Sequence, residues 1–552
     1  MLTVSYYDKK EHVLGKVAEY LRSHLDGEIT DAVDVRENFS TDGGLLKIVP
    51  QTAVYPFNEQ DVRKVARFAW QLAEKGKKIG VTSRGLGSDW SSSAIGDGIV
   101  VVFPAHMNKI IELDSRKGEM VLEPGATIGK INQALIIHGL YFPVEPLSSE
   151  FSTIGGAVST NATGLRSAKY GSTSKNVQSL RVVLSNGEFL STSRISKRDV
   201  RKRMGLTTFE GEIYRGLDAI LNEYEEPIRA YTGVGELSPM NIFDVRDKDG
   251  SVDLTPLFMG SQGTLGIVTQ AKVKITAFNP GLKQVVCGFY NEEQFAQAAP
   301  EIAKLGPSIF TVIPKLAFQL FASLNPLYVG KQFGEHLPEY LLLLEWDEFS
   351  IRSQKKSLKK LRKICSKLEV TMHTASSEKS KESLAKFFRI PSVLLQSEIE
   401  QARAVPGIES SYIPPHNYVA ATKEVDKLFH SVSTRYVSWY DYTNGIVRYF
   451  PFLDLRQLGQ RQKLLKLIES YNAIVVTYGG LVGINGGGRI AAGYHKDISG
   501  DVLYEVFEKV KQLFDPYMIL NPGVKFAVDK KALSSKMAQG YTLGHRHSHL
   551  PQ

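Results

Sequence analysis

The chain has 552 residues, of which 43% are hydrophobic and 23% charged. This is ordinary globular composition, which excludes a fibrous or disordered protein, and the length predicts about two to four domains. The net charge of +9 is dispersed in runs such as Lys355-Lys356, and no basic stripe interleaved with stacking aromatics accompanies it, so we expect no nucleic-acid partner.

The first 49 residues are predicted to be a segment that precedes the first domain. Their start, Met1 to Asp8, lacks the basic and then apolar pattern of a secretory signal. No run of about 18 apolar residues that could span a bilayer is found in the chain. We therefore expect a cytoplasmic protein, and its basic composition is compatible with peripheral contact with a membrane.

Residues 50–280 mix helices and short strands without strict alternation, which favours α+β over a doubly wound sheet. Apolar spacing predicts a capped amphipathic helix over residues 56–76 and a buried strand over 99–103. Two hairpins follow: one turns at Lys117-Gly118, and the other leaves the strand 180–184.

From residue 281 the residue pattern changes. Strand-like segments, such as Val285 to Phe289 and Tyr340 to Glu345, are separated by lysine-rich amphipathic helices. We interpret residues 281–459 as a second domain. Residues 460–528 are predicted to be a C-terminal helical segment around a glycine-rich stretch, and residues 529–552 a disordered tail. The only two cysteines, Cys287 and Cys365, exclude a disulfide framework and a cysteine-based zinc or iron–sulfur site.

Two glycine-rich segments carry the strongest chemical signal. The first is Arg84-Gly85-Leu86-Gly87-Ser88, and the second runs from Thr153 through Gly155-Gly156 to Gly164. Glycines allow close approach of the backbone, and exposed peptide N–H groups with Ser and Thr hydroxyls can cradle a pyrophosphate. Each alone could be merely a tight loop, and for the shorter segment taken alone the tight loop is the favoured interpretation.

Together, at this distance and in this order, these segments resemble the FAD-binding domain of the vanillyl-alcohol oxidase and p-cresol methylhydroxylase superfamily. Residues 50–61 and 260–269 are similar to further parts of that domain, and residues 514–523 to the C-terminal signature of the branch containing D-lactate, glycolate and D-2-hydroxyglutarate dehydrogenases. The resemblance spans residues 36–526. It implies an α+β fold with a two-subdomain FAD-binding domain of the p-cresol methylhydroxylase type at 50–280. A cap with an antiparallel sheet would follow, and the C-terminal segment would complete the flavin site.

The resemblance also assigns residues to the flavin. Those expected to bind FAD are Arg84, Gly85, Leu86, Gly87, Ser88, Pro146, Thr153, Gly155, Gly156, Ser159, Asn161, Gly164, Ile267 and Asn521. Relatives that attach the flavin covalently use a histidine or cysteine of the early loops. Here Ser88-Asp89 follows Gly87 and no cysteine precedes Cys287, so we expect FAD to be bound non-covalently.

Two family motifs are altered in this chain. The branch carries Gly-Glu-His-Gly-x-Gly-Arg, whose histidine is the proposed catalytic base, but Asn485 stands at that position. An amide cannot accept a proton near neutral pH, although it can orient a hydroxyl. The metal-binding motif His-x-Gly-Asp-Gly-Asn-x-His corresponds to residues 441–448, with Asp441 and Arg448 at the two histidine positions. Because Arg448 is permanently charged, we predict no metal there.

Three residues are therefore candidates for catalysis: Asn485, Arg389 and Arg448. Arg389 matches an arginine that contacts the substrate carboxylate in relatives. Arg448 is expected either to bind that carboxylate or to form an internal ion pair with Asp441. Replacements for the missing base are Tyr440, Tyr442, Tyr478 and His495, each of which could equally be structural.

The resemblance implies an FAD-linked oxidoreductase acting on CH–OH groups, which oxidises a D-lactate-like 2-hydroxy acid. Its electrons would pass to a quinone, cytochrome or other protein acceptor. An oxidase acting on another alcohol or sugar, and a catalytically altered flavin-binding subunit of a larger complex, remain alternatives. A nicotinamide-binding interpretation rests on Gly486-Gly487-Gly488 after the apolar run 474–476, but no βαβ unit surrounds it.

Overall fold

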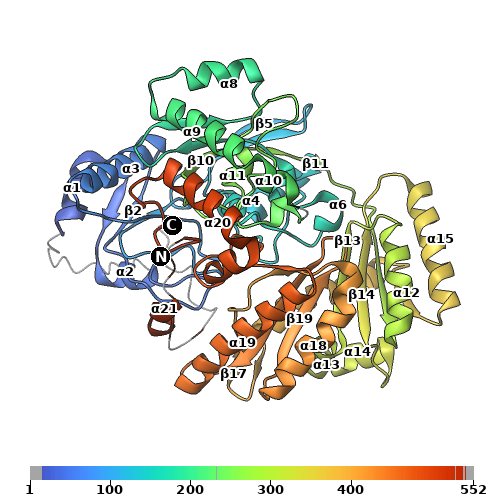
Figure 1. Ribbon diagram of the computed structural model, residues 1–552. Helices are drawn as coiled ribbons and strands as arrows, with labels where there is room; N and C mark the ends of the chain where they lie inside the picture. Colours follow the sequence, from blue (N-terminus) through green and yellow to red (C-terminus); the bar gives the residue numbers. More distant parts are fainter. Residues whose placement is uncertain (1–14, 232, 527, 529, 539–540, 542–552) are drawn as a thin grey trace, which may run out of the picture.

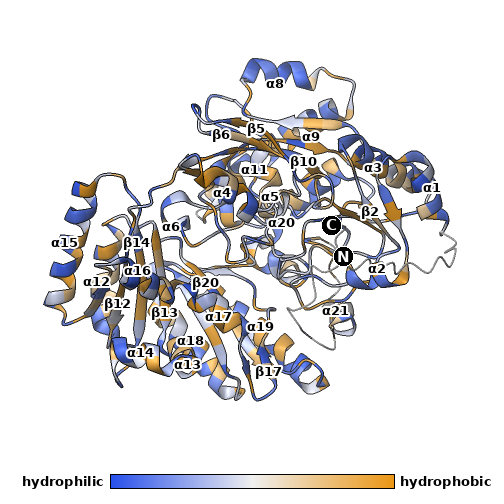
Figure 2. Ribbon diagram, turned by 180° about the vertical axis from the view of Figure 1, so that it is seen from behind, coloured by the Kyte–Doolittle hydropathy of each residue, from blue (hydrophilic) through white to orange (hydrophobic). Residues whose placement is uncertain are grey.

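The computed structural model describes residues 15–231, 233–526, 528, 530–538 and 541. The chain forms two lobes (Figure 1): an N-terminal lobe, to which the C-terminal segment returns, and a second lobe around a large sheet, which we call the cap. Both lobes combine helices with sheets, so the predicted α+β class is confirmed. Strands are the most apolar parts of the ribbon, and helices cover them on their outer sides (Figure 2).

The first part of the N-terminal lobe is a four-stranded sheet in the order β1-β2-β4-β3, in which β2, β4 and β3 run parallel. Its elements are α1 (Lys16–His24), β1 (Glu28–Thr30), α2 (Val33–Asn38), β2 (Thr52–Tyr55), α3 (Glu59–Glu74), β3 (Val81–Arg84) and β4 (Ile99–Val102). Helix α3 begins after Asn58, whose side chain accepts hydrogen bonds from the N–H groups of Gln60 and Asp61. Its buried side chains, including Val62 and Val65, pack with the strands in one core. The helix predicted over 56–76 is therefore confirmed.

The second part is an antiparallel sheet in the order β5-β6-β10-β8-β9. Its strands are β5 (Ile110–Asp114), β6 (Glu119–Leu122), β8 (Val177–Val183), β9 (Phe189–Thr192) and β10 (Ile267–Lys274), and the short pair β7 (Leu140–Tyr141) and β11 (Thr276–Ala277) lies apart. The helices are α4 (Ile128–Ile136), α5 (Ile154–Thr160), α6 (Ser167–Tyr170), α7 (Thr173–Asn176), α8 (Lys197–Met204), α9 (Phe209–Glu223), α10 (Glu225–Ala230), η1 (Gly235–Leu237) and α11 (Thr255–Phe258). Both predicted hairpins are present, as β5–β6 and β8–β9.

The cap is built on a sheet whose main path is β15-β12-β14-β13-β19-β20-β17-β16. Its strands are β12 (Lys283–Phe289), β13 (Ile309–Pro314), β14 (Tyr340–Trp346), β15 (Thr371–Thr374), β16 (Glu398–Ile399), β17 (Ala402–Ala404), β18 (Ser411–Tyr412), β19 (Tyr436–Asp441), β20 (Ile446–Leu453) and β21 (Leu481–Val482). All its pairings are antiparallel, as the resemblance implies.

Helices cover the cap sheet on both faces. They are α12 (Glu292–Ala303), α13 (Lys315–Leu324), α14 (Pro326–Phe333), α15 (Ile351–Lys367), α16 (Glu378–Ala385), η2 (Phe387–Arg389), α17 (Ile390–Gln396), η3 (Pro415–Asn417), α18 (Tyr418–Ser431) and α19 (Leu458–Thr477). Helices α12, α15, α18 and α19 share a core with one face of the sheet. Helices α13, α14, α16 and α17 share a second core with the opposite face.

The C-terminal segment returns to the N-terminal lobe with η4 (Ala491–Tyr494), α20 (His495–Phe514) and α21 (Lys530–Lys536). After α20 the chain runs beside β3, where the Val81 N–H donates to the Ile519 carbonyl at 2.8 Å. Contrary to the predicted disorder beyond residue 529, the segment 530–538 is packed: Met537 is buried, and Ala538 N–H donates to the Leu45 carbonyl at 2.8 Å. The final residues, from 542, lie outside the described part of the chain.

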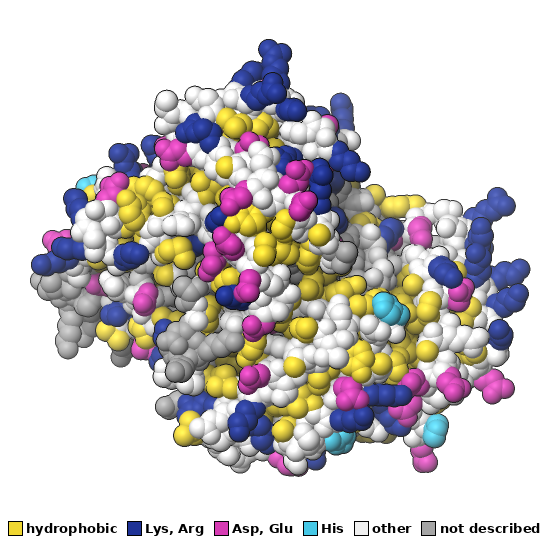
Figure 3. All heavy atoms as spheres, viewed as in Figure 1, with side chains coloured by type: hydrophobic (Ala, Val, Ile, Leu, Met, Phe, Trp, Pro, Cys, Tyr) yellow, Lys and Arg dark blue, Asp and Glu magenta, His cyan; other side chains and the backbone are white. Residues whose placement is uncertain are grey.

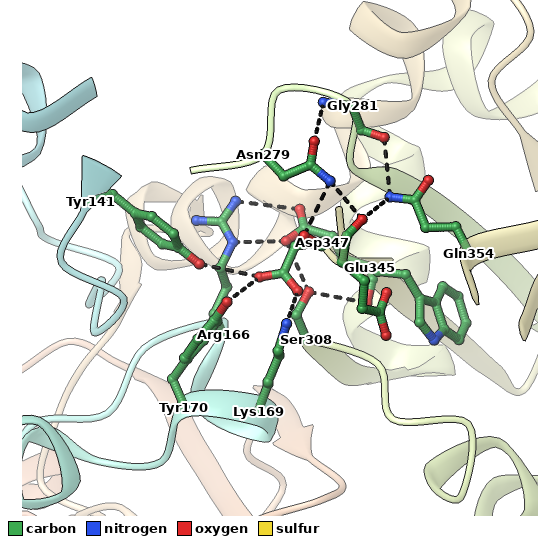
Figure 4. A network of polar contacts seen from close by, with 12 residues as sticks. Tyr141, Arg166, Lys169, Tyr170, Asn279, Gly281, Ser308, Glu345, Asp347 and Gln354 are labelled. Carbon is green, nitrogen blue, oxygen red and sulfur yellow. Dashed lines mark hydrogen bonds and ion pairs between the residues drawn. The ribbon is translucent and has the colours of Figure 1, made fainter. Parts of the chain in front are cut away.

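A network of polar side chains joins the two lobes (Figure 4). Arg166, just after the second glycine-rich segment, forms ion pairs with Glu145 at 2.8 Å and with the fully buried Glu345 of β14 at 2.7 Å. Lys169 pairs with Asp347 at 2.5 Å. Asp347 also accepts a hydrogen bond from the Tyr170 hydroxyl at 2.6 Å. The network therefore fixes the glycine-rich segment against the cap sheet.

Candidate active site

A cleft of about 1390 Å³, its open mouth included, lies between the two lobes. The N-terminal lobe supplies the loop that follows β3 and the segment that contains α5. The cap supplies residues of β13, β19 and β20, and the glycine-rich stretch after β21 adds Asn485. The cleft therefore brings together the two glycine-rich segments and the two altered motifs of the sequence.

The first glycine-rich segment forms a tight loop at the end of β3. Arg84 is 3% exposed, donates from Nη1 to the Ala94 carbonyl at 3.1 Å, and its guanidinium lies 5.1 Å from the ring centre of Phe39. Gly87 has φ +71°, and a Cβ there would collide with the Arg84 guanidinium. Arg84 thus holds the loop from within, while the backbone of 85–88 faces the cleft.

The second segment wraps around the short helix α5. Thr153 caps it, because its Oγ1 accepts the Gly156 N–H at 3.1 Å. A Cβ on Gly155 would lie 2.7 Å from Cβ of Pro124, whereas a Cβ on Gly156 would have only the Thr153 hydroxyl within 4 Å, at 3.1 Å. Gly155 is therefore required for packing. Gly156 keeps space open in the cleft wall.

Most of the residues predicted to bind the cofactor share this cleft. Those that line it are Arg84, Gly85, Leu86, Gly87, Ser88, Pro146, Thr153, Gly155, Gly156, Ser159 and Gly164. Three others lie behind the wall: Asn161, Ile267 and Asn521 are buried outside the lining. Asn161 ends α5 in a left-handed conformation and donates to the Glu236 carbonyl at 3.0 Å.

Asn521 braces the wall from behind. Its Nδ2 donates to the carbonyls of Ser93 at 2.8 Å and Gln262 at 2.7 Å, and its Oδ1 accepts from the Thr82 hydroxyl at 3.1 Å. Asn521 therefore ties the C-terminal segment to β3 and to the lining residues Ser93 and Gln262, without lining the cleft itself. Next to Ile267, Val268 lines the cleft instead.

The cap contributes one face of its sheet to the cleft. Asp441 of β19 lies opposite Thr311 of β13, and Arg448 of β20 lies opposite Trp439 of β19. Paired residues of antiparallel strands point to the same side, and residues two apart on one strand share a face. All four side chains therefore lie on one face of the sheet, and all four line the cleft.

Arg448 faces the cleft as a cation without an acidic partner. Its Nη2 donates to the Thr163 hydroxyl at 2.7 Å, which links the cap to the second glycine-rich segment. Among the described residues, no carboxylate lies within ion-pairing distance of Arg448, so the internal pair with Asp441 is not formed. Burial lowers the pKa of Arg448 to about 10, which leaves it protonated at neutral pH.

Two carboxyl groups line the cleft. Burial raises the pKa of Asp441 to about 6, against hydrogen bonds that it accepts from Asn444, the shorter one 2.7 Å long. Burial also raises the pKa of Asp89, whose Oδ2 accepts hydrogen bonds from the hydroxyl groups of Ser91 and Ser93. Asp441 is the one that lies on the cap, beside Arg448. It can exchange a proton near neutral pH.

Asn485 lies where the cleft meets the glycine-rich stretch 486–488. Its Nδ2 donates to the Ser410 hydroxyl at 3.3 Å, and its Oδ1 is buried without a partner in the described structure. The following Arg489 is structural: it donates to the carbonyls of Ser92 at 3.0 Å and Ile95 at 2.6 Å. Asn485 therefore carries an unpartnered, buried amide oxygen at the edge of the cleft.

Arg389 does not line the cleft. Its side chain is exposed on η2. The candidate replacements for the base also lie elsewhere. Tyr440 donates to the Ile413 carbonyl at 2.9 Å within the core on the other sheet face, and His495 is buried with a pKa lowered by burial to about 3. The apolar run 474–476 lies inside α19, which removes the strand that a nicotinamide-binding unit requires.

Several lining residues escaped the sequence analysis. They are Asp89, Trp90, Thr163, Gln262, Thr311 and Trp439. Gln262 Oε1 accepts the Gly488 N–H at 2.9 Å, which joins two loops more than 200 residues apart. Asp89 and Trp90 could have been predicted to line the cleft, because they directly follow the first glycine-rich segment. No sequence pattern marks the strand residues Thr311 and Trp439 of the cap as lining residues.

The cleft lining contains no histidine, cysteine or tyrosine among the described residues. In the same part of the chain, no group of three or more His, Cys, Asp or Glu side chains is placed to hold a metal ion. A search of its helices for a long apolar segment finds none able to cross a bilayer.

Comparisons with known proteins agree with this architecture. Residues 50–193 match the family described as FAD binding domain, and residues 282–524 match the C-terminal domain of FAD linked oxidases. The chain is 27% identical to D-2-hydroxyglutarate dehydrogenase of Escherichia coli over 93% of its own length, but it spans only 51% of that protein. It thus covers about half the length of the first curated relatives it matches.

A relative of similar length is glycolate oxidase subunit GlcD of Bacillus subtilis, 24% identical over 88% of this chain and 90% of that protein. Among solved structures, p-cresol methylhydroxylase with substrate bound superposes with a TM-score of 0.64 at 14% identity, covering 93% of this chain and 96% of that one. The latter likeness concerns the fold alone.

The two lobes and the glycine-lined cleft between them define a flavin-dependent oxidoreductase. The chain belongs to the FAD-binding p-cresol methylhydroxylase and vanillyl-alcohol oxidase superfamily, and is related to 2-hydroxy acid dehydrogenases. The cleft fits such a cofactor, because Gly156 leaves open space in its wall, and Gly85 and Gly87 line it at positions where Thr153 and Arg84 leave no room for a side chain.

Proposed function

We propose that the chain oxidises a 2-hydroxy acid with non-covalently bound FAD. The observation that carries this proposal is Arg448, a half-buried guanidinium that faces the cleft and forms no ion pair among the described residues. A partly desolvated cation that no carboxylate contacts directly is costly, and a substrate carboxylate would supply that contact. The names of the relatives, D-2-hydroxyglutarate dehydrogenase, glycolate oxidase and D-lactate dehydrogenase, support the substrate class.

The residues of the two lobes have separate roles in this proposal. The backbone of 85–88 and of 155–156 would hold FAD, which supplies the two-electron acceptor when bound. Arg448 binds the substrate carboxylate. Asn485 orients the hydroxyl group through its free Oδ1, and Asp441, deprotonated above a pH of about 6, accepts the hydroxyl proton.

Non-covalent attachment is supported by the cleft lining, which offers no histidine, cysteine or tyrosine in the described part of the chain. The electrons have no cysteine-bound cluster to enter, because the chain has only two cysteines. We infer that they leave to an external acceptor such as a quinone, a cytochrome or another protein.

The test is an anaerobic titration of the purified yellow protein with a panel of D- and L-2-hydroxy acids, followed by flavin absorbance. Bleaching by at least one 2-hydroxy acid, and not by the matching alcohol that lacks the carboxylate, is the expected result. Bleaching by neutral alcohols or sugars alone would support the alternative of an oxidase acting on another alcohol or sugar. No bleaching by any of them would support a catalytically altered subunit.

Flavin attachment is tested separately. Acid precipitation should release all the yellow colour into the supernatant. Colour that stays with the precipitated protein would contradict non-covalent binding, whichever substrate is found.

A further inference from the structure

Helix α15 carries an unusual concentration of positive charge. Its 17 residues include six lysines, two arginines and no acidic residue. All eight cationic side chains are exposed, whereas Gln354, Leu361 and Cys365 of the same helix are buried. We call these eight the α15 stripe: Arg352, Lys355, Lys356, Lys359, Lys360, Arg362, Lys363 and Lys367.

The stripe is continuous along one side of the helix. Its members recur at intervals of three and four residues, which places them on neighbouring positions of a single face. The helix is about 25 Å long and stands at the outer edge of the cap (Figure 1). Figure 3 shows dark blue side chains gathered along this edge. The stripe is therefore an extended cationic ridge.

The charges of the stripe are not neutralised within the protein. In the described part of the chain, no ion pair or hydrogen bond involves any of its eight side chains. Two of the three acidic side chains of the neighbouring α12 are engaged elsewhere, since Glu292 pairs with Lys423 and Glu301 with Lys304. The other basic helix, α8, differs: Lys202 pairs with Asp199 at 2.9 Å and Arg203 with Glu210 at 2.6 Å.

Such a stripe does not stabilise its own helix. Like charges four residues apart, such as Lys355 with Lys359 and Lys359 with Lys363, repel each other. Solubility alone does not require all of them on one face, because mixed charges would serve equally well. An external anionic surface would remove this repulsion.

Two exposed apolar side chains adjoin the stripe. Phe349 is 61% exposed and Ile351, the first residue of α15, is 66% exposed. Cations beside exposed apolar side chains are typical of segments that bind the interface of an anionic membrane. A nucleic acid fits less well, because the stripe is mostly lysine and has no row of aromatic side chains on which bases could stack.

We propose that the α15 stripe, with Phe349 and Ile351, docks the protein on a membrane surface rich in anionic lipid. Helix α15 shares a core with the sheet face opposite the one that lines the cleft. Docking through α15 therefore leaves the cleft open. The proposal does not depend on the substrate proposed above.

The experiment is co-sedimentation of the full chain with vesicles of phosphatidylcholine, alone or with about 30% phosphatidylglycerol, at low salt. We expect at least tenfold tighter binding to the anionic vesicles, and weaker binding as salt is added. Binding equal for both vesicles, or absent from both, would overturn the proposal.

A triple variant locates the surface. Lys355→Glu with Lys359→Glu and Lys363→Glu should lower binding at least tenfold. The matched control, Lys197→Glu with Arg198→Glu and Arg201→Glu on α8, makes the same change in net charge and should retain binding. Equal losses in both variants would show a net-charge effect and overturn the assignment to α15.

Three further measurements complete the test. Phe349→Ser with Ile351→Ser should weaken the binding that remains at higher salt, whereas unchanged binding would remove these two side chains from the proposal. The thermal unfolding temperature and bound flavin of every variant should match the parent, because α15 lies away from the cleft. Binding of double-stranded DNA as tight as that of anionic vesicles, and lost in the α15 triple variant, would replace the lipid surface by a nucleic acid.

Discussion

At the residue scale, Arg448 is the charge on which substrate recognition is expected to depend. Truncation of its side chain in Arg448→Ala should weaken binding of a 2-hydroxy acid or its 2-oxo product by about 2 to 4 kcal/mol, because a charge-assisted contact in a buried site is lost. Arg448→Lys should lose less, since the positive charge remains and only the paired geometry changes. The measurement is the dissociation constant from the flavin spectral shift.

Arg389→Ala is the matched control for this prediction. Arg389 is exposed and does not line the cleft, so its removal should change the same constant by less than about 1 kcal/mol. A large loss in Arg389→Ala with none in Arg448→Ala would mean that the cap closes differently around the substrate than the cleft geometry indicates.

Asp441 should give the reaction its pH dependence. Burial raises the pKa of Asp441 to about 6, so the carboxyl is neutral below this pH and charged above it. As a base it must be charged, and the rate of flavin reduction should rise with pH through about 6. Oxalate, an unreactive dianion, should bind more weakly over the same range, because the charged carboxylate repels it. The other ionisable groups lining the cleft are Arg84, Asp89 and Arg448.

The conservative variants separate proton transfer from structure. Asp441→Asn should abolish both pH effects and lower the rate, whereas Asp441→Glu should keep an inflection. Oxalate binding, followed by the shift in thermal unfolding temperature, reads the titration without catalysis. An inflection near pH 6 that persists in Asp441→Asn would assign it to another group, such as Asp42, whose pKa burial also raises to about 6.

These residue assignments show what the sequence could predict of the site. The two glycine-rich segments act through their backbone, and their composition is visible in the sequence. Trp439 and Thr311 could not be predicted, because they reach the cleft through the pairing of β13, β19 and β20, which depends on contacts between distant strands. Arg389 was assigned by resemblance, and its exposure depends on how η2 packs.

At the scale of elements, α5 shows how two adjacent glycines differ. A Cβ at Gly156 would approach only the Thr153 hydroxyl, at 3.1 Å, and the larger valine side chain would extend into the cleft. Gly156→Val should therefore abolish FAD retention while the unfolding temperature of the apoprotein changes little. The measurements are the ratio of flavin to protein absorbance and circular dichroism.

Gly155→Val is the informative comparison. There a Cβ would lie 2.7 Å from Cβ of Pro124 and 2.9 Å from its carbonyl oxygen, so overpacking should destabilise the apoprotein by about 1 to 3 kcal/mol. If both variants lost flavin and stability equally, α5 would be a packing element and the cofactor would lie elsewhere.

Element boundaries followed the sequence where local signals were strong. Asn58 caps α3 and the turn at Gly118 joins β5 to β6, both within the predicted ranges. The short apolar run 474–476 is ambiguous between strand and helix, and it proves to be the end of α19. The segment 530–538 has few apolar residues, yet Leu533 and Met537 are buried because neighbouring elements provide the rest of the core.

At the scale of the whole molecule, the network of Figure 4 determines how the two lobes are held over the cleft. Glu345 is fully buried and accepts hydrogen bonds from Arg166 at 2.7 Å, Ser308 at 3.1 Å and Gln284 at 3.1 Å. Arg166 directly follows the second glycine-rich segment and Leu165, both of which line the cleft. A change in the network should therefore affect stability and flavin binding together.

Glu345→Ala should destabilise the protein by about 3 to 5 kcal/mol, because it leaves the Arg166 guanidinium buried with only Glu145 as a counter-charge. The double variant Arg166→Met with Glu345→Leu removes both charges and should recover most of this loss, since a buried ion pair is often no more stabilising than apolar packing. Urea unfolding of the apoproteins measures both. If the double variant is stable but binds FAD at least tenfold more weakly, the ion pair serves to position the glycine-rich segment against the cap. If its FAD affinity is unchanged, the pair contributes only to the interface between the lobes, and the orientation of that segment is fixed by the remaining contacts, Arg448 with Thr163 and Lys169 with Asp347.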